Sequence, residues 1–122
     1  MTDLPEPQQA PALTRDELAA MYPAPEPIQA HECDALERLI ALAKGDTGQS
    51  RRVAVFLLAW WNAGAHGGFD LADLWGLDRE IAADAATVFG LIARVHSYPD
   101  ALGYEADFKR LVRIWRPEAR DA

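Results

Sequence analysis

Four side chains of this 122-residue chain are of the types that bind transition metals. His31 and Cys33 stand two residues apart, and His66 and His96 lie farther along the chain. Together they offer the nitrogen and sulfur ligands that a tetrahedral zinc ion prefers. Structural zinc sites, however, usually contain tighter ligand pairs, and Cys33 is the only cysteine. We therefore expect no metal, and we interpret His66 as a loop residue and His96 as a partner of a helix C-terminus.

No catalytic motif is recognisable in the chain. It contains no nucleophile elbow, no Walker or dinucleotide-binding loop, no zinc-protease helix and no Cys–His pair at a suggestive spacing. The neighbouring carboxylates Asp70 and Asp73 have a simpler explanation in helix capping and solvent exposure. We therefore expect no catalytic residue, no cofactor and no enzymatic activity.

Tryptophan and arginine provide the better candidates for binding. Adjacent Trp60 and Trp61 would point about 100° apart on a helix, so at least one of them should approach the surface. Trp75 lies in a separate short segment. Exposed aromatic side chains are typical of binding and self-association surfaces. A basic face near the C-terminus would suit phosphate or an acidic partner, or it is only a solvated face. The residues of this basic face are Lys109, Arg110, Arg113 and Arg116.

The formal net charge of −7 is concentrated near the N-terminus. Residues 1–37 hold eight acids and one base, whereas residues 38–122 hold eleven of each. An acidic arm repels phosphate backbones and anionic lipid, and it is attracted to basic protein surfaces. The alternative is that the arm serves only as a solubilising tail.

Helical patterns must position all of these side chains. Apolar spacing, capping residues and glycine stops predict five helices after residue 30. They run from about His31 to Lys44, from Asp46 or Thr47 to about Ala63, from Asp70 to Gly76, from Asp78 to about Val95 and from about Tyr104 to Trp115. The predicted buried stripe of the fourth helix comprises Leu77, Ile81, Ala85, Val88, Phe89, Ile92 and Val95.

The second of these helices organises the predicted fold. Its nine consecutive apolar residues, 53–61, are too few to span a bilayer, which needs about 20. A helix that is apolar all round must be covered by protein. No stretch alternates with a period of two, so no strand is expected. We therefore predict an all-α fold: a single small orthogonal bundle of four to five helices around a hydrophobic central helix.

The first thirty residues differ in composition from the rest. Six of the eight prolines lie there, and Thr14 and Glu17 have the spacing of a helix capping box. We therefore divide the chain into a proline-rich acidic N-terminal arm with one short helix (1–30), a helical domain (31–117) and a C-terminal tail (118–122).

Residues 71–77 and the helix that follows imitate a helix-turn-helix motif. Ala72, Gly76 and Leu77 stand where that motif needs a small residue, a glycine and an apolar residue. The following helix, however, begins with three acids that would face phosphates. We therefore favour a structural turn over a DNA-reading element.

From about Leu36 to Pro117 the chain also resembles a known group of proteins. The segments that carry the resemblance are GDTGQSRRV (45–53), LLAWWN (57–62), GFDL (68–71) and SYPDALGY (97–104). They resemble a family of small uncharacterised proteobacterial proteins, often encoded on plasmids and integrative conjugative elements. The resemblance implies a mobile-element setting and no mechanism.

These observations favour a non-enzymatic protein-binding accessory domain of a mobile genetic element. We expect a cytoplasmic protein, because the N-terminus lacks a secretory signal and the lone cysteine suits a reducing compartment. We expect a protein partner, and a homodimer is also permitted. We expect neither a membrane nor nucleic acid as a partner. One alternative is a nucleic-acid-binding regulator of the helix-turn-helix type. Another is an acidic inhibitor of a host nucleic-acid-binding defence complex.

Overall fold

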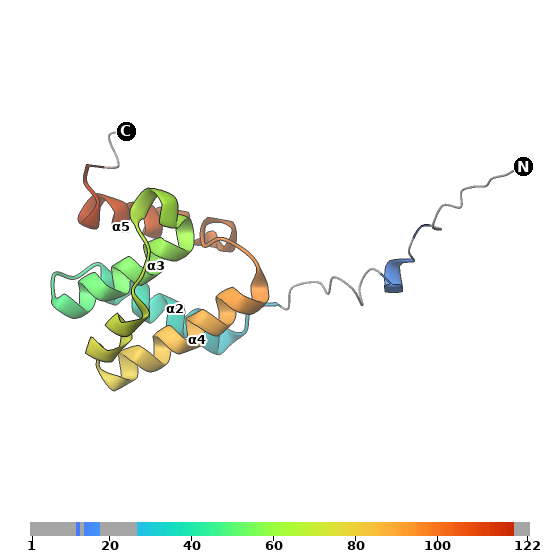
Figure 1. Cartoon of the computed structure of the whole chain (residues 1–122), viewed down its shortest axis with the longest axis horizontal. Coiled ribbons are helices and arrows are strands. Elements are labelled where there is room, and N and C mark those ends of the chain that lie inside the picture. The colour runs from blue at the N-terminus through green and yellow to red at the C-terminus, as the bar shows by residue number, and fades with distance from the viewer. Residues whose placement is uncertain (1–11, 13, 18–26, 119–122) are drawn as a thin grey trace, which may run out of the picture.

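The computed structural model describes residues 12, 14–17 and 27–118 of the chain (Figure 1). Every regular element within these residues is helical and none is a strand, which confirms the predicted all-α fold. The elements are α2 (Ala30–Ala43), α3 (Gly48–His66), the 3₁₀ helix η1 (Leu71–Gly76), α4 (Arg79–Val95), the π-helical turn η2 (Asp100–Tyr104) and α5 (Glu105–Trp115).

Helix α2 contacts each of the other three α-helices. It packs against α3 and α4, and α5 lies across α3 (Figure 1). The four helices bury one continuous apolar core. Its members are Ala35, Leu36, Leu39, Ile40, Ala43, Val53, Ala54, Phe56, Leu57, Leu58, Ala85, Val88, Leu91, Val95, Phe108, Leu111 and Val112. The apolar residues that recur at helical spacing in α2 (Leu36, Leu39, Ile40 and Ala43) and in α5 (Phe108, Leu111 and Val112) are all buried.

One residue of the predicted stripe on α4 is misplaced. Phe89 is 57% exposed, whereas Leu91, which the pattern had left out, is fully buried. The packed face of α4 centres on Val88, Leu91 and Val95. Because successive helical residues are about 100° apart, Phe89 turns away from this face although it directly follows Val88.

Local capping signals are largely where the sequence placed them. The side chain of Thr47 accepts a hydrogen bond from the Ser50 amide at the start of α3 (3.0 Å), and that of Asp70 accepts one from Ala72 at the start of η1 (3.0 Å). The capping box is present as well, because Thr14 and Glu17 exchange bonds of 2.9 and 3.1 Å. The remainder of the short arm helix lies outside the described residues.

Asp78 does not cap α4 with its side chain, contrary to expectation. Instead, the side-chain amide of Gln49 from the first turn of α3 reaches this junction. Gln49 Nε2 donates to the Gly76 carbonyl (2.7 Å), and the Asp78 amide donates to Gln49 Oε1 (2.9 Å). One amide group therefore joins α3 to both the end of η1 and the start of α4.

We expect Gln49→Ala to lower the free energy of unfolding by about 1–2 kcal/mol, because two hydrogen bonds to backbone groups are lost. The Asp78 amide should also exchange its hydrogen faster. Denaturant unfolding and amide exchange measure the two effects. Gln49→Glu keeps the acceptor but not the donor, so it should give an intermediate result; unchanged stability and exchange would contradict this role for Gln49.

The C-terminal end of α5 supplies donors to two other helix ends. Trp115 Nε1 donates to the carbonyl of Ala43, the last residue of α2 (2.7 Å). Arg116 Nε donates to the carbonyl of His66, the last residue of α3 (3.1 Å). Carbonyls at helix C-termini lack partners within their own helix. Helix α5 therefore satisfies backbone groups of both helices.

None of the helices in the described part of the chain has the length and hydropathy needed to cross a bilayer.

Candidate functional site

Trp60 and Trp61 lie in the C-terminal half of α3 and are half-buried. Both rings meet the ring of Phe108 edge-on, with centroids 6.0 and 5.8 Å away. Trp60 Nε1 also donates to the Ser97 carbonyl (3.2 Å). These contacts fix the orientation of both tryptophans, while part of each ring remains accessible to solvent.

Two neighbouring hollows lie beside these tryptophans and share Trp60 and Tyr98 in their walls. The first measures about 290 Å³, and its lining residues are Trp60, Ile92, His96, Ser97 and Tyr98. The second measures about 530 Å³, and its lining residues are Ala59, Trp60, Trp61, Asn62, Ala63, Tyr98 and Asp100. Tyr98 is 62% exposed. We call Trp60, Trp61, Ile92, His96 and Tyr98 the aromatic surface.

The backbone is irregular around the aromatic surface. His96 adopts a left-handed conformation (φ 59°, ψ 40°), which costs a residue with a side chain roughly 1 kcal/mol. The dihedral angles of Asn62 break the helical path of α3, and the π-helical turn begins at Asp100. Irregular backbone of this kind is concentrated at functional sites. Two of the segments that carry the sequence resemblance, residues 57–62 and 97–104, meet here.

The chemistry of the aromatic surface is that of recognition. The Tyr98 hydroxyl makes no hydrogen bond to any described residue, so it is available to a ligand. Burial and the nearby Arg116 lower the pKa of His66, whose ring lies 5.8 Å from that of Trp61. The surface thus offers flat apolar rings with single polar groups at their edges.

The four residues considered as zinc ligands give no such site. Within the part of the chain that the structure describes, no three His, Cys, Asp or Glu side chains are grouped to hold a metal ion. His31 and Cys33 lie in the first turn of α2, whereas His66 ends α3 and His96 follows α4.

Trp75 lies apart from the aromatic surface. It belongs to η1, which Gln49 joins to the first turn of α3. Gln49 and Trp60 are about 16 Å apart along the axis of α3. Trp75 is 88% exposed, and Leu71 at the start of the same element is 62% exposed. The structure therefore does not unite the three candidate tryptophans in one site.

The basic face of α5 is smaller than the sequence suggested. Lys109 pairs with Glu105 one turn earlier (3.2 Å). Arg116 is half-buried and bonded to the His66 carbonyl. Arg110 and Arg113 are exposed and have no polar partner among the described residues. Two of the four candidate cations are thus available to an anionic ligand.

The segment that imitates a helix-turn-helix has an unusual first element. This element, η1, is a 3₁₀ helix of six residues. Its successor α4 packs against α2, and an ion pair between Asp84 and Arg38 (2.9 Å) joins the two helices. The exposed residues at the start of α4 include Asp78 and Glu80.

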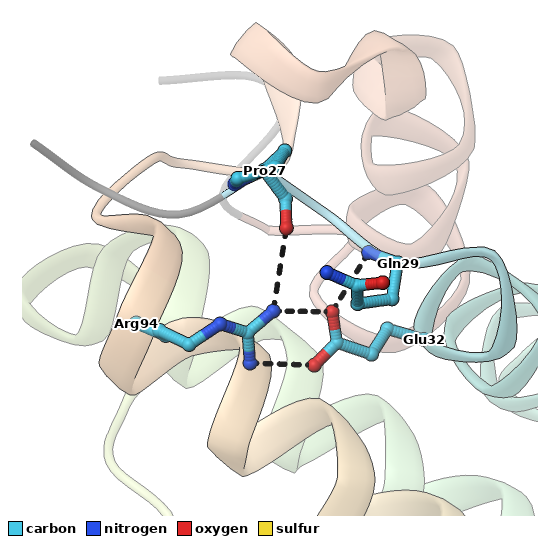
Figure 2. Close-up of polar contacts among 4 residues, drawn as sticks. All are labelled: Pro27, Gln29, Glu32 and Arg94. Atoms are coloured by element: carbon cyan, nitrogen blue, oxygen red, sulfur yellow. Dashed lines mark hydrogen bonds and ion pairs between the residues drawn. The ribbon is translucent and has the colours of Figure 1, made fainter.

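An ion pair that the sequence did not suggest lies where the arm joins the domain. Arg94 of α4 donates one hydrogen bond to each carboxylate oxygen of the buried Glu32, both of 2.7 Å (Figure 2). Gln29 donates its backbone amide to the same carboxylate (2.9 Å), and Arg94 Nη2 also reaches the Pro27 carbonyl (3.4 Å). The hydrogen bonds from Arg94 lower the pKa of Glu32 from 4.5 to about 2, although burial opposes them.

This geometry revises the charge of the arm. Three of the eight acids near the N-terminus, Glu32, Asp34 and Glu37, belong to α2. Glu32 is paired with Arg94, and Glu37 accepts a hydrogen bond from the Tyr104 hydroxyl (2.9 Å). Residues 1–30 therefore contain five acids and one base. Gln29 and Glu32 form a second capping box. Their spacing of three residues is the sequence signal that places Glu32 in the first turn of α2.

Comparison with known proteins gives a family but no described relative. Neither a curated protein nor a solved structure is significantly similar to the chain. One family model does match, over residues 33–116, and it covers most of the chain from the first turn of α2 to the end of α5. The chain therefore belongs to a family of unknown function (DUF7673).

Proposed function

We propose that this chain is a non-enzymatic protein-binding domain that receives an apolar segment of its partner on the aromatic surface. The observation that carries the proposal is the pair of hollows flanking Tyr98, with Trp60 shared between them. Tryptophan and tyrosine are the residues most often found to dominate binding energy at protein interfaces.

Preorganisation supports the same proposal. Binding is opposed by the entropy lost when side chains are immobilised, about 0.5–1.5 kcal/mol for each flexible one. Trp60 is already held by Ser97 and Phe108, so little further entropy is lost when a ligand contacts it. Tyr98 adds a large ring with few rotatable bonds and an available hydroxyl.

The setting that we propose is a mobile genetic element in the cytoplasm, with this domain as an accessory factor. Support comes from the sequence resemblance given above and from the lone, unpaired Cys33. The neighbouring genes in the native host test the setting directly. Binding of nucleic acid through Arg110 and Arg113 is the second candidate, favoured by their exposure without a polar partner among the described residues.

The experiment is affinity capture from the native host with the wild type, Tyr98→Ala and Leu71→Ala. Tyr98 and Leu71 are both 62% exposed, but only Tyr98 belongs to the aromatic surface. We expect a partner that the wild type and Leu71→Ala retain and that Tyr98→Ala loses. Truncation of a central interface aromatic costs about 2 kcal/mol or more, roughly a 30-fold weaker complex.

Capture of the same proteins by all three chains would remove the aromatic surface from the proposed function. Partners that disappear after nuclease treatment would instead favour the nucleic-acid candidate, and their binding should then fall steeply with added salt.

A further inference from the structure

The second of the two hollows beside Tyr98 contains a negative charge that the first lacks. Its lining includes the carboxylate of Asp100, the first residue of η2, whereas no acid among the described residues lines the first hollow. Asp100 is exposed and has no polar partner in the described part of the chain. Neither hollow is lined by a lysine or arginine of the described residues. The second hollow therefore combines the rings of Trp60, Trp61 and Tyr98 with an unpaired carboxylate.

The backbone beside the second hollow adds partial negative charge. Asn62 interrupts the helical path of α3, and its Oδ1 accepts a hydrogen bond from the Ala65 amide (3.1 Å), as a capping side chain does at the start of a helical segment. The preceding segment of α3 therefore ends at Trp61, which lines the hollow together with Ala59 and Trp60. The last carbonyl groups of a helix carry about half a negative charge in total, and they favour a nearby cation.

Aromatic rings beside a carboxylate have the chemistry that binds an organic cation. The face of a tryptophan or tyrosine ring is negative, so a cation within about 6 Å of the ring is attracted to it. Trp60 and Trp61 are already held by Phe108, so this part of the wall is in place before a ligand arrives. A metal ion is a poor candidate, because no group of three metal-binding side chains exists among the described residues.

Among the cationic side chains of proteins, arginine suits these groups best. Its guanidinium group is planar, stacks on aromatic rings and donates two parallel hydrogen bonds to one carboxylate. The ammonium group of lysine is more strongly hydrated, so it loses more when it leaves water. The Tyr98 hydroxyl, which has no partner among the described residues, can accept a further N–H bond.

We propose that the second hollow is a binding site for an arginine side chain of the partner protein, with the guanidinium group against the aromatic rings and bonded to the Asp100 carboxylate. The inference rests on the proposed function and names the chemistry of the ligand. Trp60 and Tyr98 line both hollows, so an apolar side chain in the first and an arginine in the second would lie next to each other on one segment of the partner.

The test follows the indole N–H resonances of the full chain by NMR during a titration with the capped tripeptide acetyl-Gly-Arg-Gly-amide. Trp60 and Trp61 report on the hollow, and Trp75 in η1 is the internal reference. We expect a saturable shift of Trp60 or Trp61 and none of Trp75. The matched probe replaces arginine by citrulline, which has nearly the same shape without the charge and should bind about tenfold more weakly or worse.

Equal binding of the arginine and citrulline peptides would overturn the inference, since shape and not charge would then decide. Tighter binding of acetyl-Gly-Lys-Gly-amide than of the arginine peptide would overturn the assignment to arginine.

Variants of the chain locate the charge that attracts the peptide. Asp100→Asn should weaken binding of the arginine peptide about tenfold, and Asp100→Glu should retain most of it, because a carboxylate is kept. The control is Asp46→Asn. Asp46 is likewise exposed and without a polar partner among the described residues, but it precedes the opposite end of α3. Equal weakening by Asp46→Asn and Asp100→Asn would show a general effect of charge and would contradict a site at Asp100.

The two proposals can fail separately. In the capture experiment, Asp100→Asn should retain less of the partner than Asp100→Glu does. If Tyr98→Ala abolishes capture while the arginine and citrulline peptides bind alike, the protein-binding function stands and its ligand is not a cation at Asp100. If the arginine peptide binds through Asp100 while Tyr98→Ala captures the same proteins as the wild type, the arginine site stands and the proposed function falls.

Discussion

Phe108→Ala is expected to lower the free energy of unfolding by about 3–5 kcal/mol, the usual loss when a buried phenylalanine is truncated. Phe108 is fully buried, and its ring carries both Trp60 and Trp61 edge-on. Its loss removes the apolar contacts of all three rings and leaves a cavity between α3 and α5. Domains of this size have only about 5–15 kcal/mol of stability, so the variant should be largely unfolded well below the wild-type melting temperature.

Thermal melting followed by circular dichroism measures this effect, and tryptophan emission should shift to longer wavelength as Trp60 and Trp61 become solvated. The control is Ile114→Ala on the same helix, because Ile114 is 36% exposed and loses fewer contacts. Equal melting temperatures for Phe108→Ala and Ile114→Ala would show that α5 does not hold the tryptophans as described.

Arg94→Met is expected to destabilise the domain by about 2–3 kcal/mol at pH 7, because it leaves the buried Glu32 carboxylate without its cation. The methionine retains much of the apolar stem of arginine, so the change isolates the ion pair. The control is Arg38→Met. Arg38 also donates two hydrogen bonds to a carboxylate, from Nε and Nη2 to the two oxygens of Asp84 (2.9 Å each), but its side chain is 62% exposed. We expect little change in that variant, since exposed ion pairs are screened by water.

The effect of Arg94→Met should depend on pH with a definite sign. The pKa of Glu32 is about 2 in the folded chain and 4.5 ordinarily. A lowered pKa contributes stability above the ordinary value, and this contribution is lost as the pH falls from about 4.5 toward 2. The difference in melting temperature between wild type and Arg94→Met should therefore be full at pH 6 and shrink steadily below pH 4.5. A difference independent of pH would exclude the ion pair as its source.

Helix positions could be predicted from the sequence because their signals are local. Caps such as Thr47 and Asp70 and stops such as Gly45 act within one turn, so they need no knowledge of the partner helices. The burial of Phe89 was mispredicted because it depends on contacts with distant parts of the chain. Both Phe89 and Leu91 fit an apolar stripe, and only the direction from which α2 and the 69–77 segment approach α4 decides which of them is covered.

Only part of the candidate site could be predicted from local sequence patterns. Trp60 and Trp61 could be predicted because adjacent residues on a helix point about 100° apart, so at least one of the two rings should approach the surface. Tyr98 could not be predicted, since its importance comes from standing between two hollows whose walls are more than thirty residues apart in the chain. For the same reason Glu32 and Arg94, separated by 62 positions, gave no sign of pairing.

The donors that α5 supplies to the ends of α2 and α3 have a consequence for synthesis. A ribosome adds about 5–20 residues per second, so Trp115 follows Trp61 by roughly 3–10 s. During that delay α2 and most of α3 are already made and α4 is completed, whereas the carbonyls of Ala43 and His66 still lack the donors of α5 and the tryptophans lack Phe108. The emerging chain therefore exposes the apolar rings of its tryptophans until α5 packs against them. Chaperones that recognise exposed apolar segments have their opportunity in this interval, and it closes when α5 docks.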